Sequence, residues 1–316
     1  MKRSVPIILI LGLVLMLIGG CSPADQSSPA SAPKGPVIVG SKIDTEGALL
    51  GQMIIAVLKA NGFTVVDKTE FGPTNLIRKA LLGGEIDIYP EYTGNGAFFF
   101  AGSDTSVWKD AAKGYAAIKK LDYDQNQVVW LQPAPANNTW AIAVRNDLAQ
   151  AQKLVTMEDF AQYAKRSGQI KLAASEEFVN SPAALPAFQS AYDFNLKKEQ
   201  LLTLSGGNTS QTEKAAADQT DGVNFAMAYG TDGSLAALGL VILQDTRGVQ
   251  PVYEPAPIVR GAVYSKYPEM SLVLDPVFAS LDLVTLQRLN AKIAVEGQQA
   301  AAVAGEYLRS QGFLKQ

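Results

Sequence analysis

The chain has 316 residues and a formal net charge of −3. It contains no histidine and a single cysteine, Cys21, which excludes serine–histidine triads, histidine metal sites and internal disulfides. No basic run follows the first residues, so nucleic acid and anionic membrane surfaces are poor partners. We therefore expect neither a metal nor a cofactor.

The N-terminus indicates export from a bacterial cytoplasm. Lys2 and Arg3 precede an apolar run, Val5–Ile18, that is too short for a membrane span of about 20 residues and is typical of a secretory signal. The run ends in Leu-Ile-Gly-Gly-Cys at 17–21, which resembles a lipobox and predicts lipidation of Cys21. An uncleaved anchor or an ordinary signal is the alternative. Each of these interpretations puts the remaining chain in the periplasm or at the cell-envelope surface.

Residues 22–36 are rich in Ser, Pro and Ala and predict a flexible tether, with folding beginning near Val37. The rest of the chain is long enough for two packed lobes. Its first part predicts strands at 36–40, 64–66 and 86–89, separated by helices at 47–60 and 75–82. This β-α-β-α-β order indicates an α/β fold.

Alternation continues to the C-terminus. The next predicted helix is 111–121, followed by extended segments at 128–131 and 140–144. Further helices are predicted at 156–166, 184–192, 209–219, 276–281, 283–294 and 298–311. We expect the last three helices to pack against the first lobe.

Two segments follow predicted strands where α/β sheets bind ligands, namely 40–47 and 89–96. Lys42 in the first is suited to an anion, and Tyr92 in the second to a cation. Glu46 and Glu91 in the same segments also suggest a carboxylate-dependent hydrolase. We prefer a helix-terminus role for Glu46, and a cap, an ion pair or a contact with a partner protein for Glu91.

Four aromatic residues, Tyr92, Trp140, Tyr229 and Tyr253, occur in polar, turn-rich motifs. A quaternary ammonium ion donates no hydrogen bond, so proteins capture it on the negative faces of aromatic rings, at roughly 0.5–2 kcal/mol per ring. The set predicts an aromatic cage and therefore solute binding, and we expect no enzymatic activity.

Five ordered motifs stand out: Gly-Ser-Lys-Ile-Asp-Thr-Glu at 40–46, Ile-Asp-Ile-Tyr-Pro-Glu-Tyr-Thr-Gly at 86–94, Pro-Ala-Asn-Asn-Thr-Trp-Ala-Ile-Ala-Val at 135–144, Ala-Tyr-Gly-Thr-Asp-Gly at 228–233 and the stretch 251–260. Together they resemble the osmoprotectant-binding proteins of ABC importers, in particular the YehZ (OsmF) branch. The resemblance implies a type II periplasmic binding protein, with two α/β lobes joined by two hinge crossings around a ligand cleft. Lobe one would be 37–138 plus 250–316, and lobe two 139–249.

The resemblance also implies roles for single residues. The four aromatic residues match the cage for glycine betaine or choline, while Lys42 and Asn95 match positions that hold the ligand carboxylate. Asn95 stands where the family often has threonine. Ser181 stands near the place where relatives usually carry an arginine that clamps the carboxylate, and losing that contact removes about 1.5–3 kcal/mol. We therefore expect weak glycine betaine binding or a ligand without a carboxylate.

The expected partners are a small quaternary ammonium ligand and the permease and ATPase subunits of an ABC importer. The membrane is contacted only through the N-terminal lipid, and the protein is expected to be a monomer. A binding protein for choline, another cation or an amino acid is the first alternative. An extracytoplasmic hydrolase is the second, and a purely structural lipoprotein the weakest.

Overall fold

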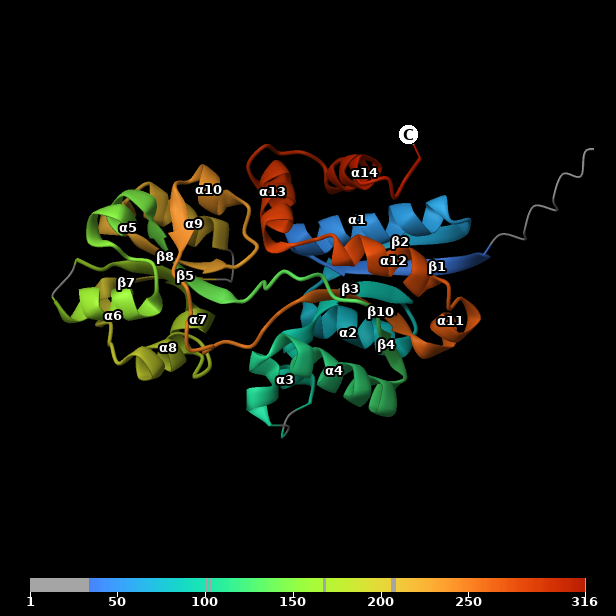
Figure 1. Cartoon of the computed structure of the whole chain (residues 1–316), viewed down its shortest axis with the longest axis horizontal. Coiled ribbons are helices and arrows are strands. Elements are labelled where there is room, and N and C mark those ends of the chain that lie inside the picture. Colours follow the sequence, from blue (N-terminus) through green and yellow to red (C-terminus); the bar gives the residue numbers. More distant parts are fainter. Residues whose placement is uncertain (1–33, 101, 103, 167–168, 206–208, 316) are drawn as a thin grey trace, which may run out of the picture. The chain divides into compact units, whose positions relative to one another are not determined.

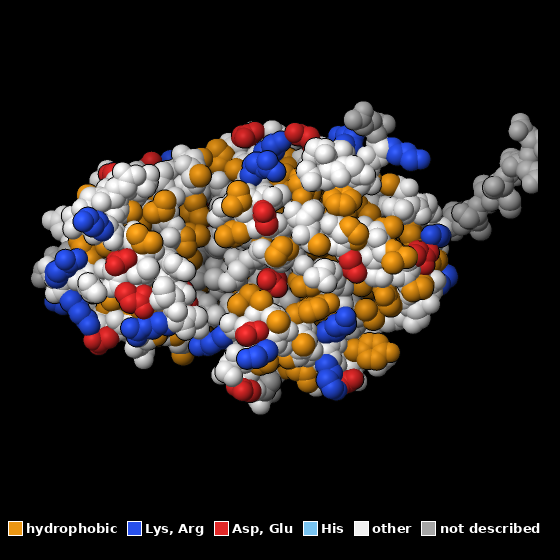
Figure 2. All heavy atoms as spheres, in the orientation of Figure 1, with side chains coloured by type: hydrophobic (Ala, Val, Ile, Leu, Met, Phe, Trp, Pro, Cys, Tyr) orange, Lys and Arg blue, Asp and Glu red, His pale blue; other side chains and the backbone are white. Residues whose placement is uncertain are grey.

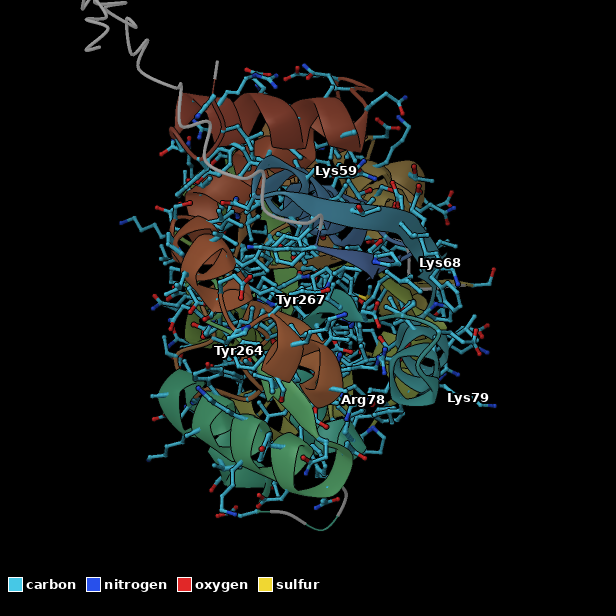
Figure 3. The ribbon with its side chains drawn as sticks, turned by 90° about the vertical axis from the view of Figure 1, so that its right-hand side faces the viewer. Lys59, Lys68, Arg78, Lys79, Tyr264 and Tyr267 are labelled. Carbon is cyan, nitrogen blue, oxygen red and sulfur yellow. The ribbon has the colours of Figure 1, made fainter. Side chains whose placement is uncertain are left out.

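The computed structural model describes residues 34–100, 102, 104–166, 169–205 and 209–315, which belong to one compact unit. The predicted signal, Cys21 and most of the predicted tether lie outside these residues. β1 begins at Lys34, so the expected start of folding near Val37 was three residues late. The early residues are held because the Gly35 N–H donates to the Tyr267 hydroxyl at 2.9 Å and Lys34 pairs with Glu269 at 2.8 Å. Figure 3 labels Tyr267 at this end of the molecule.

Two five-stranded mixed sheets organise the chain (Figure 1). Sheet A has the order β2 (Phe63–Gly72), β1 (Lys34–Lys42), β3 (Ile88–Tyr92), β10 (Pro255–Arg260), β4 (Val128–Trp130). Sheet B has the order β7 (Leu201–Leu204), β6 (Leu172–Ser175), β8 (Phe225–Tyr229), β5 (Trp140–Arg145), β9 (Leu240–Ile242). We call sheet A with its helices lobe one and sheet B with its helices lobe two.

Helices flank both sheets. Those of lobe one are α1 (Thr45–Ala60), α2 (Thr74–Gly83), α3 (Gly96–Phe99), α4 (Ala111–Asn126), α11 (Gly261–Lys266), α12 (Met270–Ala279), α13 (Leu283–Ala294) and α14 (Ala300–Ser310). Those of lobe two are α5 (Asn146–Gln152), α6 (Met157–Lys165), α7 (Glu176–Asn180), α8 (Leu185–Tyr192), α9 (Thr209–Ala217) and α10 (Ser234–Ala237). Short 3₁₀ turns are η1 (Thr93–Asn95), η2 (Thr105–Lys109), η3 (Lys198–Gln200) and η4 (Thr220–Gly222).

The predicted β-α-β-α-β start is confirmed, because β1, β2 and β3 are parallel and alternate with α1 and α2. The later strand β10 enters the same sheet antiparallel to β3 and β4. The predicted packing of the C-terminal helices is also confirmed, since α12, α13 and α14 all contact α1. Their buried apolar side chains form one core with α1 and sheet A.

One predicted helix boundary was wrong. α12 starts at Met270 and contains Pro276, although we expected the helix to start at that proline. Proline removes one helical hydrogen bond. The four buried side chains of α12, Met270, Leu274, Val277 and Phe278, offset that loss by removing apolar surface from water.

The described residues contain no single helix with the length and apolarity to cross a membrane; only α12 and α13 together, bent by 90°, meet those two requirements. On the face in Figure 2, acidic and basic side chains are interspersed, without a large field of one sign. Charged neighbours can differ sharply in burial. Lys79 is exposed on α2, whereas Arg78 beside it is buried against Asp122 (both labelled residues are in Figure 3).

Two segments connect the lobes, residues 131–139 between β4 and β5, and residues 243–254 between β9 and β10. They run side by side, because the Asn138 N–H donates to the Tyr253 carbonyl at 2.9 Å and the Thr139 hydroxyl to the Pro251 carbonyl at 2.9 Å. α13 makes a further contact between the lobes, with Gln287 Nε2 donating to the Gly230 carbonyl at 2.8 Å.

Candidate functional site

In lobe two, Trp140 and Tyr229 form an aromatic wall. They are direct partners in the antiparallel register of β5 and β8, which puts their side chains on the same face of sheet B. Their rings are stacked at 17°, with centroids 6.5 Å apart. Phe178 of α7 packs edge-on against Trp140 at 5.9 Å. The two ring planes therefore stand nearly parallel on this face of sheet B.

In lobe one, Tyr92 ends β3 and is only 5% exposed. Its hydroxyl donates to Glu46 at 2.8 Å, and the Lys42 ammonium lies 4.6 Å from its ring centroid. Lys42 therefore already supplies a cation to one face of this ring.

Lys42 and Asn95, the residues expected to hold a ligand carboxylate, share a carboxylate of the chain itself. Lys42 Nζ lies 2.6 Å from Glu91 Oε1, and Asn95 Nδ2 donates to the same oxygen at 2.7 Å. Glu91 also accepts from the Tyr89 hydroxyl and the Tyr92 N–H, each at 2.7 Å. Of the cap, ion pair or partner contact expected for Glu91, the structure shows the ion pair. This fully buried carboxylate engages the donors of the polar end.

Tyr253 lies on the second connection, and its ring packs directly on Gly94. A Cβ at Gly94 would lie 2.7 Å from the Tyr253 ring, so this approach requires glycine. The Tyr253 backbone is fixed by the first connection, with its N–H donating to Asn137 Oδ1 at 2.8 Å. The Asn137 carbonyl also packs against Gly230, since a Cβ at Gly230 would lie 2.1 Å from the Asn137 carbonyl oxygen.

These contacts bring the four aromatic residues into one neighbourhood around residues 137–139. The electrostatics agree. Burial, with Glu177 among the neighbouring carboxylates, raises the pKa of both Tyr229 and Tyr253 to about 12. Burial, Glu46 and Asp44 raise the pKa of Tyr92 well above its usual value, and Asp44 also acts on Tyr229. Acidic residues of both lobes, Asp44 and Glu46 in lobe one and Glu177 in lobe two, thus act electrostatically on these rings.

Glu46 connects this neighbourhood to α13. It lies in the first turn of α1, as expected, behind the N-cap Asp44. Its Oε1 accepts from Tyr92 and from Asn138 Nδ2 at 3.2 Å, and its Oε2 accepts from Asn290 Nδ2 at 2.7 Å. Burial raises the pKa of Glu46 to about 7, although hydrogen bonds with Thr231, Tyr92 and Asn290 lower it.

A second pair of buried acids supports the turn that follows Tyr229. Asp232 Oδ2 accepts the Tyr229 N–H at 2.6 Å, and Glu213 Oε2 accepts from the Ser234 hydroxyl at 2.5 Å. Burial and their mutual repulsion raise the pKa of Glu213, and burial raises that of Asp232. The two carboxyl groups therefore retain a proton that ordinary carboxyls would lose.

α7 ends just before Ser181, the position at which the resemblance implies an arginine in relatives. Ser181 caps this helix with an extended backbone, φ −67° and ψ 124°, and its N–H donates to the Glu177 carbonyl at 2.8 Å. Glu177, four residues earlier, is exposed and acts electrostatically on Tyr229 and Tyr253. α7 therefore faces the aromatic residues with an acid.

A hollow of about 840 Å³ lies where α13 meets lobe two. Trp140, Asp232 and Gln287 are among its lining residues, and the other three aromatic candidates are not. The hollow therefore reaches Trp140 and not the other three rings.

Sequence reasoning did not identify Asn138, Asn290 and Glu177 as members of this site, and it assigned Glu46 only a helix-terminus role. Asn138 stands in a quoted motif, so its position gave a usable signal. Asn290 is on a C-terminal helix, 244 residues from Glu46, and no sequence pattern connects the two.

Comparisons with known proteins agree on one family. The family model described as the substrate binding domain of ABC-type glycine betaine transport systems matches residues 35–310. The glycine betaine-binding protein YehZ of Escherichia coli K12 is 54% identical over 304 residues, covering 96% of this chain and 97% of its own. A glycine-betaine-binding protein of Pseudomonas aeruginosa is 30% identical, covering 87% and 88%. The solved structure of apo YehZ from E. coli matches with a TM-score of 0.78 and 57% identity, over 88% of this chain and 99% of that one.

Proposed function

Because the chain belongs to the family of substrate-binding domains of ABC-type glycine betaine transport systems, with the two-lobed fold of type II periplasmic binding proteins, we propose that it captures a quaternary ammonium solute of the glycine betaine class outside the cytoplasm. It delivers that solute to the permease of an ABC importer, whose separate ATPase subunits hydrolyse ATP. A lipid on Cys21 holds it at the membrane. It binds its ligand without transforming it.

The juxtaposition of four aromatic residues carries this proposal. Trp140 and Tyr229 offer stacked faces from lobe two, Tyr92 stands in lobe one, and Tyr253 comes from a connection between the lobes. An ammonium head between such rings gains about 0.5–2 kcal/mol from each ring once water is excluded. A complete cage thus needs both lobes, and the ligand's contacts with both favour closure.

The polar end supports weak binding of the carboxylate. Lys42 and Asn95 meet the ligand carboxylate only in competition with Glu91, which engages both. Ser181 supplies no cation. We propose that glycine betaine is bound with low affinity and that most of the binding free energy comes from the ammonium end.

The lobes move about their two connections. We propose lobe one as 37–138 plus 250–316 and lobe two as 139–249, which puts both boundaries within the paired segments 131–139 and 243–254. Hydrogen bonds of Asn137, Asn138 and Thr139 with the second segment keep the two segments together while the lobes separate.

Tryptophan fluorescence tests the cage directly. The chain has three tryptophans, and Trp108 and Trp130 are each 1% exposed, so a change on ligand addition reports mainly on the half-buried Trp140. We expect the tryptophan fluorescence to change saturably with glycine betaine. Comparison with choline and proline betaine then shows how much the ligand carboxylate contributes to binding. Trp140→Phe keeps a ring but removes the signal and weakens binding.

Calorimetry of the same ligands with both proteins supplies the control. Loss of the fluorescence change in Trp140→Phe with unaltered affinity would remove Trp140 from the cage. Absence of binding up to about millimolar ligand, equivalent to about −4 kcal/mol, would overturn the proposed ligand class.

A further inference from the structure

Glu46 occupies a position between the two lobes that its place in a helix does not explain. Its side chain is in lobe one, yet Asn290 Nδ2, which donates to Glu46 Oε2 at 2.7 Å, also donates to the Thr231 carbonyl of lobe two at 2.9 Å. Thr231 follows the cage candidate Tyr229 by two residues. Through Oε1, the same carboxyl group holds the hydroxyl of Tyr92.

We propose that Glu46 is a positioning residue whose ionised form holds Tyr92 and the Tyr229–Thr231 turn in their ligand-binding arrangement, so that ligand binding is coupled to release of a proton. This inference rests on the proposed function, because it concerns the same aromatic site.

The hydrogen bonds explain why the ionised form is required. The Tyr92 hydroxyl, Asn138 Nδ2 and Asn290 Nδ2 donate to Glu46, and the Thr231 side chain also hydrogen-bonds to it. A carboxylate accepts from all of these donors, whereas a protonated carboxyl must donate one hydrogen bond of its own. Protonation therefore breaks or reverses at least one of these contacts.

The amide of Asn290 transmits the change to lobe two. Its Oδ1 is buried without a hydrogen-bond partner among the described residues, and so is that of Asn138. A protonated Glu46 can be satisfied if the Asn290 amide rotates and accepts through Oδ1. That rotation withdraws Nδ2 from the Thr231 carbonyl, because the amide presents only one edge to both groups. The lobe contact beside Tyr229 is then lost.

A bound cation acts in the opposite direction. Its charge next to Tyr92 favours the ionised form of Glu46, so the ligand lowers the pKa of Glu46 below its value of about 7 in the free protein. Binding then releases a proton near neutral pH, and by reciprocity affinity falls as the pH falls.

Other ionisable groups face Glu46 from the elements around it. Asp44 on its own helix raises the pKa of Glu46, and Tyr92 on β3 titrates only at high pH. The charged groups on the other neighbouring elements are engaged elsewhere: Lys42 with Glu91, Lys292 with Glu306, Asp232 with Glu213, and Arg288 beside Asp282. Glu46 is thus the group here that titrates near neutrality among contacts joining both lobes.

The test measures glycine betaine and choline affinity between about pH 5.5 and pH 8.5, with proton release counted by calorimetry in buffers of different ionisation enthalpy. Neither ligand titrates in this range. We expect wild-type affinity to fall up to about tenfold per pH unit on the acid side, since one proton is coupled. Glu46→Gln has weak, pH-independent binding and releases no proton, because its amide resembles the protonated carboxyl.

Two further variants keep the test decisive. Tyr92→Phe retains the ring but removes one donor, so the midpoint of the pH dependence moves upward. Glu269→Gln changes a half-buried acid that pairs with Lys34 far from Glu46 in the sequence, and leaves the pH profile unchanged. A wild-type protein that binds ligand with flat affinity and no proton release overturns the role of Glu46. A protein that binds neither ligand at any pH overturns the proposed function instead.

Discussion

At the scale of single residues, the polar end of the site differs most from what the motifs imply. The ammonium of Lys42 lies on the ring of Tyr92, and its charge is neutralised by Glu91. The pair thus carries the two charges of a zwitterion: the Lys42 ammonium lies against the Tyr92 ring, and the Glu91 carboxylate accepts from the Asn95 amide. A ligand carboxylate therefore meets donors that are already satisfied, and breaking a buried ion pair is costly.

Restoring a free cation should strengthen carboxylate binding. We expect Ser181→Arg to raise glycine betaine affinity ten- to a hundredfold, about 1.5–3 kcal/mol, while choline affinity changes little. The extended backbone of Ser181 accepts any residue, and Glu177 on the same helix faces Tyr229 and Tyr253. Calorimetric titration with both ligands measures the ratio.

Ser181→Gln is the matched control, since it adds length without charge. Equal gains for glycine betaine and choline in Ser181→Arg, or the same gain in Ser181→Gln, would show that α7 does not reach the carboxylate.

At the scale of elements, the contact between α13 and the turn after β8 is close enough to be sensitive to one methyl group. A Cβ at Gly233 would lie 2.1 Å from the Ala291 backbone nitrogen, although φ of Gly233 is an ordinary −78°. The constraint is therefore steric. It fixes how α13, Gln287 and Asn290 meet the turn that carries Thr231.

We expect Gly233→Ala to separate α13 from this turn, lowering the unfolding free energy by about 1–3 kcal/mol and weakening ligand binding with it. Gly83→Ala is the control, because Gly83 ends α2 with nothing within 4 Å of its Cβ position. Chemical denaturation and titration of both variants test this. If Gly233→Ala leaves the unfolding free energy unaltered, α13 moves away from the turn at no cost in stability, and the prediction is wrong.

At the scale of the whole molecule, buried acids govern the response to pH. Glu46 and Glu213 have raised pKa values in the folded state, so between the unfolded and folded pKa values the folded protein binds more protons than the unfolded chain. Stability therefore falls as the pH rises through this window. Exposed acids with lowered pKa values, such as Glu306, act only at lower pH.

We expect the melting temperature to be higher near pH 5 than near pH 8. Glu46 alone contributes about 3 kcal/mol to this difference in unfolding free energy, because its pKa is 4.5 in the unfolded chain and about 7 in the folded protein. Glu213→Gln should reduce the remaining loss above neutral pH, since one acid of the buried pair is gone. Calorimetric scans across pH measure this. A melting temperature that rises between pH 5 and pH 8 would contradict the assignment.

Local pattern alone was sufficient for much of the fold. Capping residues, glycines and apolar periodicity predicted β1, α1, α2 and α13 closely, because these signals act within a few residues. The predicted strand 86–89 shares only two residues with β3. The strands β6, β7, β8, β9 and β10 were missed, since three to six residues carry too little periodicity to distinguish a strand from a loop. The motifs were sufficient to identify the family and to select candidate residues.

The tertiary structure decided which groups meet. That Lys42 pairs with Glu91, and that Glu46 reaches Asn290 and Thr231, depends on contacts between residues up to 244 positions apart. A sequence states which donors and acceptors exist, but burial and distance determine which of them are already satisfied and which proton a buried carboxyl keeps. The residue types were therefore fixed by the sequence, and their partners and charge states by the packing of the two lobes.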